Sequence, residues 1–214
     1  MSSPQAPSAE PGDGTTHAAR VIRAAALAPQ RWANGGGWTR EIHREPAAGR
    51  PEATLWRLSL ADIEATGPFS TFPGMRRHLL SAAPVPLRLS VDGVDHDLHY
   101  TQVVSFAGDR EVATTGVQGR AQALNLMVRT GLRGGIDLLR GDAHMPVSAA
   151  AATALVVLEG IVSLGGRRLE RFDTVLPGTD EARLGLRGAT VARMRAAVPE
   201  RKEGPEQQEA PTPR

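Results

Sequence analysis

Short apolar segments constrain the fold of this chain more than any other feature. Between residues 20 and 198, runs rich in Val, Leu and Ile are broken by Gly, Pro or Asp about every ten residues. Strands of this spacing are typical of a β-sandwich or barrel, whereas alternating strands and helices need longer amphipathic periods. The sequence therefore predicts an all-β fold. Helical signals are weak, and residues 60–64 are predicted to form one or two helical turns before Gly67-Pro68 ends them.

One hairpin can be drawn residue by residue. Asp92-Gly93 separates two alternating segments, 87–91 and 94–98, and Asp-Gly is a strong signal for a two-residue hairpin turn. A second hairpin is predicted over 154–172, and the alanines at 149–152 are predicted to lead into its first strand. The first hairpin places His96 on the apolar face, as a core histidine. Its expected pairs are Val91 with Val94, Leu89 with His96, Leu87 with Leu98, and the oppositely charged Arg88 with Asp97.

The two ends of the chain differ from its interior in composition. Residues 1–19 and 199–214 are rich in Pro and polar residues and lack apolar periodicity, so both are predicted to be disordered. This leaves one folded region, residues 20–198. The chain has no cysteine, which excludes disulfides and thiolate chemistry and fits a reducing, cytoplasmic compartment. No apolar run approaches the roughly 20 residues that span a bilayer, so no membrane association is expected.

The charge pattern gives no reason to expect nucleic-acid binding. The net charge is +2, although the calculated pI is about 9.9. Lys202 is the sole lysine among 25 basic residues, and very few groups titrate between histidine and arginine, so a small positive excess persists to high pH. Neither a basic run nor interleaved aromatic residues are present.

The polar residues with the most distinctive context lie between residues 32 and 127. Three glycines follow Asn34, and they form either a tight loop between strands or a loop that faces a ligand. A phosphate-binding loop is not favoured, because residues 38–42 alternate like a strand where a helix would be required. Arg57 and Arg77 are candidate carboxylate clamps, since guanidinium offers a planar fork of donors; surface salt bridges are the alternative role.

Aromatic and amide residues in the same stretch have two interpretations each. Phe69 and Phe72 either fill the core beneath a loop or form a stacking platform. Asn125 lies on the strand face opposite Leu124 and Leu126, so a buried Asn125 would need hydrogen-bond partners or a ligand.

The histidines and carboxylates show no recognisable metal or catalytic pattern. His96 and His99 are three residues apart, so on one strand they point to opposite faces and cannot share an ion. There is no His-x-His pair and no Gly-x-Ser-x-Gly elbow, and neither a metal site nor a cofactor is expected. Glu41 and Asp109 are the candidates for a carboxylate pair, and their distance apart is left open.

Taken together, the motifs of this stretch resemble the HutD/Ves family of bacterial cupin-like proteins, which is often associated with histidine utilisation. The resemblance covers about residues 21–129 closely, and the remainder matches the general cupin hairpin pattern more loosely. Five segments carry it in the same order: Trp32-x-Asn34-Gly-Gly-Gly37-x-Thr39-x-Glu41-Ile42, Trp56-Arg57-Leu58-Ser59, Gly67-Pro68-Phe69-Ser70-x-Phe72-Pro73-Gly74-x-x-Arg77, Phe106-x-Gly108-Asp109 and Asn125-x-Met127.

The resemblance implies an RmlC-like double-stranded β-helix, with two cupin barrels packed as one unit. It also implies binding of a small carboxylate, without a metal. At two positions the acid that is usual in the family is replaced, by Ala123 and Arg76, and this predicts a changed ligand preference if either position lines the pocket. The glycine expected after Leu79-Leu80 is also missing. The expected ligand-binding residues, from the resemblance and the residue chemistry, are Asn34, Thr39, Glu41, Arg57, Ser59, Ser70, Phe72, Arg77, Asp109 and Asn125.

Three functions remain open at this point. The first is a non-enzymatic protein that binds a small carboxylate, such as a formylglutamate-like molecule, and modulates histidine or amino-acid catabolism. The second is a metal-independent cupin enzyme that uses Glu41 or Asp109 as a base. The third is a stress-associated protein-interaction module whose motifs are structural. A homodimer is a further possibility. The binding protein is the favoured interpretation, because the polar motif residues can converge on one barrel mouth.

Overall fold

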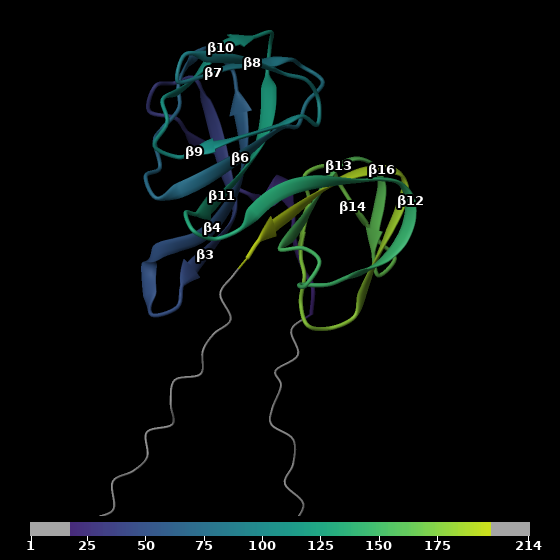
Figure 1. Cartoon of the computed structure of the whole chain (residues 1–214). Coiled ribbons are helices and arrows are strands. Elements are labelled where there is room, and N and C mark those ends of the chain that lie inside the picture. Colours follow the sequence, from purple (N-terminus) through teal and green to yellow (C-terminus); the bar gives the residue numbers. More distant parts are fainter. Residues whose placement is uncertain (1–17, 198–214) are drawn as a thin grey trace, which may run out of the picture.

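The fold consists almost wholly of antiparallel strands (Figure 1). A computed structural model describes residues 18–197; the two predicted disordered segments lie outside this range except for residues 18 and 19. A single turn of 3-10 helix is present among the described residues, at Ala24–Ala26. The strands are β1 Arg20–Ile22, β2 Gln30–Arg31, β3 Gly37–Ala47, β4 Arg50–Ile63, β5 Gly67–Pro68, β6 Met75–Ser81, β7 Leu87–Val91, β8 Val94–Leu98, β9 Val103–Ala107, β10 Val112–Val117, β11 Ala121–Arg129, β12 Gly134–Val147, β13 Ala154–Leu164, β14 Arg167–Leu169, β15 Thr174–Leu176 and β16 Ala182–Ala196.

Two sheets enclose a core in the N-terminal part of the molecule. The front sheet has the order β2-β3-β4-β11-β6-β9, and the smaller back sheet has the order β5-β10-β7-β8. Their facing side chains form an apolar cluster in which burial drives the two sheets together. The cluster contains Ala61, Ile63, Leu79, Leu87, Leu89, Leu98, Phe106, Val112, Ala121 and Ala123.

The C-terminal sheet forms the second part of the molecule and curls around its own aliphatic core (Figure 1). Its strands run in the order β1-β15-β13-β16-β12, and β14 pairs with β13. The N-terminal strand β1 therefore belongs to the sheet formed by the C-terminal strands. The residues of the core are all small or aliphatic: Val147, Ala152, Leu155, Val157, Val162, Leu169, Val175, Leu184, Leu186, Ala189 and Val191.

Strand alternation gives the front sheet two different faces. In β4, Leu58 and Leu60 point outward, while Arg57 and Ser59 point to the inside of the N-terminal unit. The outward residues of β4, β6 and β11 pack against the C-terminal sheet, so the two parts share a continuous apolar contact. Its fully buried members include Leu58, Leu80, Leu124, Leu126, Ala154, Val156, Leu158, Ala192 and Met194.

The predicted hairpin at residues 87–98 is confirmed in its register. Strands β7 and β8 pair Val91 with Val94 and Leu87 with Leu98. The predicted ion pair also forms, since Arg88 Nε donates to Asp97 Oδ1 at 2.6 Å. The interpretation of His96 as a core residue is wrong: it opposes Leu89 as expected, but it is only half-buried because β8 lies at the edge of the back sheet.

Two local predictions are also wrong. Residues 60–64 form no helix, because β4 continues to Ile63 between β3 and β11, and two rows of backbone hydrogen bonds outweigh the weak helical propensity. The alanines at 149–152 are not a strand extension either. The amides of Ala151 and Ala152 both donate to the carbonyl of Ser148, which makes a turn immediately before β13.

No helix within residues 18–197 is long and apolar enough to cross a membrane.

Candidate functional site

A cavity of about 460 Å³ opens between the front sheet and the loops that precede β3 and β6. This volume is within the range of small-molecule sites. Its inner wall consists of side chains from β3, β4, β6 and β11, and its rim consists of residues from β2, β5 and the two loops. The lining residues are Gln30, Arg31, Trp32, Ala33, Asn34, Thr39, Arg57, Ser59, Ala61, Pro68, Phe69, Ser70, Phe72, Arg77, Asn125 and Met127.

Arg77 is a buried cation at the base of this cavity. It is 4% exposed, and its guanidinium has no ion-pair partner among residues 18–197. Nη1 donates to the Ser70 carbonyl at 3.2 Å, Nη2 donates to Asn125 Oδ1 at 3.1 Å, and Nε has no partner. Burial lowers the pKa of Arg77 to about 10, with a further contribution from the charge of Arg57. The side chain therefore remains charged at neutral pH without a compensating anion.

Three phenyl rings surround the same guanidinium. The Arg77 Cζ atom lies 5.2 Å from the ring centre of Phe69, 5.5 Å from that of Phe72 and 5.2 Å from that of Phe106. Such contacts stabilise a desolvated cation through the negative faces of the rings, but they supply no net negative charge. The charge of Arg77 is thus dispersed and left unneutralised.

Arg57 supplies a second cation, and this one is neutralised. Strand register places Arg57 and Arg77 on either side of Met127, because β11 pairs with β4 on one edge and with β6 on the other. Arg57 Nε donates to Glu41 Oε2 at 2.6 Å, which forms an ion pair across β3 and β4. Glu41 itself faces a neighbouring cavity of about 750 Å³, which shares Arg57, Phe72 and Met127 with the first one.

Two neutral polar groups complete the wall beside Arg77. Asn125 and Ser59 are cross-strand neighbours and are 4% and 2% exposed. Because Asn125 Oδ1 accepts from Arg77, its Nδ2 is free to donate, and neither Nδ2 nor Ser59 Oγ has a partner among the described residues. Both residues line the cavity together with Arg77, so a guanidinium, an amide and a hydroxyl side chain border one space.

The glycine loop before β3 is a tight turn between strands, and it also forms the rim of the cavity. Asn34 Oδ1 accepts from the Gly36 amide at 3.0 Å, and its Nδ2 donates to the Pro68 carbonyl at 3.0 Å. Asn34 therefore ties this loop to the segment that carries Phe69. Gly37 is required by close packing, because a Cβ atom there would lie 2.3 Å from the Asp62 carbonyl oxygen. The interpretation as a tight loop between strands is thus confirmed, whereas a ligand-facing role stays a prediction.

Asp109 lies away from the cavity, on an exposed turn after β9. The preceding Gly108 packs closely against the loop that carries Phe72. Its amide donates to the Met75 carbonyl, its carbonyl accepts from the Phe72 amide, and an added Cβ atom would lie 2.2 Å from the Phe72 carbonyl oxygen. The Phe106-x-Gly108-Asp109 motif therefore holds the loop of Phe72 in place. Glu41 lies on β3 and Asp109 follows β9, and β4, β11 and β6 lie between these two strands in the sheet, so the two residues do not form the suggested carboxylate pair.

The cavity brings together eight of the ten residues expected to bind a ligand, all except Glu41 and Asp109. Sequence reasoning missed Trp32 and Met127 as wall residues, although both belong to the motifs that it singled out. Trp32 packs edge-on against Phe69 with ring centres 5.6 Å apart, and its Nε1 donates to Thr39 Oγ1 at 2.8 Å. The eight residues are Asn34, Thr39, Arg57, Ser59, Ser70, Phe72, Arg77 and Asn125.

The two positions at which the usual acid is replaced occupy different environments. Ala123 is fully buried on the same strand face as Asn125, in the apolar core just behind the cavity. Arg76 is exposed on the opposite face of β6 from Arg77 and does not line the cavity. Neither side chain contributes directly to the wall.

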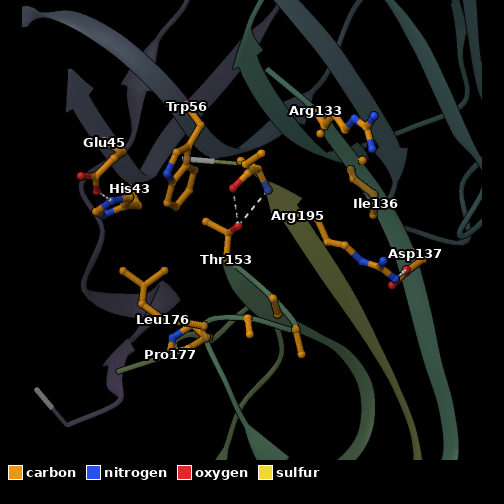
Figure 2. A pocket seen from close by; sticks show the side chains of 18 residues that line it. His43, Glu45, Trp56, Arg133, Ile136, Asp137, Thr153, Leu176, Pro177 and Arg195 are labelled. Atoms are coloured by element: carbon orange, nitrogen blue, oxygen red, sulfur yellow. Dashed lines mark hydrogen bonds and ion pairs between the residues drawn. The ribbon is translucent and has the colours of Figure 1, made fainter. Parts of the chain in front are cut away.

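A larger cavity of about 950 Å³ lies at the junction of the two parts of the molecule (Figure 2). His43 and Glu45 line one side, and Asp137 and Arg195 line the other (Figure 2). These side chains already bind one another, because His43 Nε2 lies 3.1 Å from Glu45 Oε2 and Arg195 forms an ion pair with Asp137. This cavity lacks a buried, unneutralised charge like that of Arg77, and for this reason we place the candidate site at the smaller one.

No group of three or more His, Asp or Glu side chains within residues 18–197 is arranged to hold a metal ion. His78, the buried histidine of β6, points away from the cavity, with Nδ1 2.7 Å from Ser105 Oγ.

The strand arrangement defines the fold class of this chain as cupin-like. A cupin barrel protein from Leptotrichia buccalis superposes on it with a TM-score of 0.51, covering 84% of this chain and 96% of that protein, at 9% identity. At this identity the likeness concerns the fold alone.

The chain belongs to the HutD family, whose sequence profile matches residues 24–193. An uncharacterised 21.2 kDa protein from the hutC 3′ region of Pseudomonas putida is 32% identical over 174 residues, which cover 78% of this chain and 90% of the relative. The structure of HutD from Pseudomonas fluorescens SBW25, described as a formate condition, superposes with a TM-score of 0.69. It is 26% identical and covers 85% of this chain and 100% of that protein. The family resemblance of the sequence motifs is thereby confirmed.

Proposed function

We propose that this protein binds a small carboxylate in the cavity above Arg77 and acts as a non-enzymatic modulator of histidine or amino-acid catabolism. The observation that carries the proposal is the buried guanidinium of Arg77, which has no anionic partner among the described residues. Transfer of a charge from water into a protein interior costs several kcal/mol unless an opposite charge accompanies it. A ligand carboxylate would supply that charge.

The neighbouring groups suit the same ligand. Asn125 Nδ2 and Ser59 Oγ are free donors beside the guanidinium, so one carboxylate can accept hydrogen bonds from all three side chains. Membership of the HutD family, and a relative encoded beside hutC, support the connection to histidine utilisation. We also propose that the two β parts correspond to two cupin barrels, of which the N-terminal one holds the ligand.

Calorimetric titration tests this function. The wild-type protein and Arg77→Ala are titrated with formylglutamate, urocanate and formate. We expect at least one of these anions to bind the wild type and none to bind the variant. Absence of binding by all three to the wild type would contradict the proposed ligand class.

A further inference from the structure

The walls around Arg77 are aromatic on several sides. Phe69 and Phe72 lie on the side of the loop, and Trp32 packs edge-on against Phe69. All three rings line the cavity. A carboxylate bound to Arg77 therefore has its adjoining atoms next to ring surfaces.

The rest of the lining combines apolar side chains with polar ones, and several of the polar ones already have partners within the protein. No acidic side chain lines the cavity, Arg57 is engaged by Glu41, and Arg31 lies exposed at the rim with its Cζ 5.0 Å from the ring centre of Trp38. Among the other polar residues of the lining, Asn34 is bound to Gly36 and Pro68, and Thr39 accepts from Trp32 Nε1, whereas the side chains of Gln30, Ser59 and Ser70 have no partner among the described residues. The apolar part of the wall is made of Ala33, Ala61, Pro68 and Met127. Aromatic rings of this kind prefer offset-stacked or edge-to-face contacts with another flat ring.

We infer that the ligand class is a carboxylate with a flat, unsaturated or aromatic body joined directly to the carboxyl group. The carboxylate neutralises Arg77 and accepts from Asn125, while the planar body lies among Trp32, Phe69 and Phe72. This inference rests on the proposed function and narrows it. We expect the cavity to favour a flat ligand body, because stacking against aromatic rings requires a flat partner, whereas contact with an aliphatic wall does not.

A matched pair of ligands separates flatness from size. Benzoate and cyclohexanecarboxylate have the same number of heavy atoms and the same charge, but one ring is flat and the other is puckered. We expect the wild-type protein to bind benzoate roughly tenfold more tightly than cyclohexanecarboxylate by calorimetry, and acetate more weakly than either. Benzamide, which is flat but uncharged, should show no measurable binding.

Phe72→Leu provides the protein-side control. It keeps an apolar wall and removes one ring, so the preference for benzoate over cyclohexanecarboxylate should fall severalfold while acetate affinity changes little. Equal binding of the two ring acids by the wild type would overturn the inference and leave the proposed function intact, provided that acetate or another carboxylate binds. If no carboxylate binds, both fail.

Discussion

Arg77 Nη2 and Asn125 Oδ1 lie 3.1 Å apart, and this hydrogen bond joins β6 to β11 at the base of the cavity. The contact fixes the orientation of the amide. Because the oxygen faces the guanidinium, the amide nitrogen must face the cavity. A neutral side chain thus occupies the position from which a carboxylate would have neutralised Arg77.

Asn125→Asp should convert this contact into an internal ion pair. The new carboxylate would occupy nearly the same volume and compensate the buried charge, so the affinity for a carboxylate ligand should fall more than tenfold, which is about 1.4 kcal/mol or more. Calorimetric titration measures the loss. Asn125→Ala is the control, because it removes the amide donor without adding charge and should weaken binding less. Wild-type affinity in Asn125→Asp would contradict this account of the site.

Arg77→Met tests the energetic cost of the uncompensated cation. The replacement keeps an unbranched side chain and removes a charge buried without a counter-ion, so the ligand-free variant should unfold at an equal or higher urea concentration than the wild type, despite losing two hydrogen bonds. Urea denaturation followed by circular dichroism provides the midpoints. A variant less stable by more than about 2 kcal/mol would show that Arg77 is mainly a structural residue.

Gly108→Ala should damage the site from a distance. The added Cβ would lie 2.2 Å from the Phe72 carbonyl oxygen, so the loop that carries Phe72 must move. We expect a loss of stability of about 2 kcal/mol or more, accompanied by weaker carboxylate binding. Gly135→Ala is the matched control, since nothing lies within 4 Å of a Cβ atom there. Equal effects of the two substitutions on the urea midpoint would refute the steric explanation.

The fold was predictable from the sequence wherever local pattern decides the structure. Alternation and the Asp92-Gly93 turn predict the register of β7 and β8, which the structure confirms. The segment 60–64 was not predictable in the same way. Its short-range signals favour a helical turn. Instead, β4 continues to Ile63 because it pairs with β3 on one side and, on the other, with β11, which follows almost 60 residues later in the sequence.

The site was predictable in its residue types more than in its geometry. Alternation indicates that Arg57 and Ser59 share a face, and the structure places both in the cavity. Sequence alone does not indicate that Arg57 and Arg77 flank Met127, because this arrangement depends on the order β4-β11-β6. The ion pair that neutralises Arg57 could not be foreseen either. It joins Arg57 to Glu41 across β3 and β4, and the register of these two strands shifts between Glu41 and His43.

His78 should make the stability of the protein depend on pH. Burial lowers the pKa of His78 below its ordinary value of 6.5, and the charge of Arg76 lowers it further. In acid, the unfolded chain therefore binds a proton at His78 more readily than the folded protein does. The contribution of neutral His78 to the free energy of unfolding is fully present above about pH 6.5 and is lost as the pH falls below that value. The urea midpoint of the wild type should therefore be lower at pH 5.0 than at pH 7.5. The same change of pH should lower the midpoint of His78→Gln by a smaller amount.

Asp62 provides the internal comparison for that experiment. Burial raises the pKa of this carboxyl, but hydrogen bonds from Gln122, Arg40 and Arg120 and the charge of Arg120 lower it overall. The contribution of the Asp62 carboxylate to stability is present above about pH 4 and is lost as the pH falls below that value. Asp62 therefore affects stability at lower pH than His78 does. An identical pH 7.5 to 5.0 change in wild type and His78→Gln would exclude His78 as the cause.

Calorimetric titration of the wild type and Arg77→Met with the same carboxylate tests the central claim most directly. The claim is that the unneutralised charge of Arg77 binds the ligand anion. It predicts saturable binding to the folded wild type with one ligand per chain, and a loss of affinity of at least tenfold in the folded variant. Equal affinity of the two proteins would contradict it.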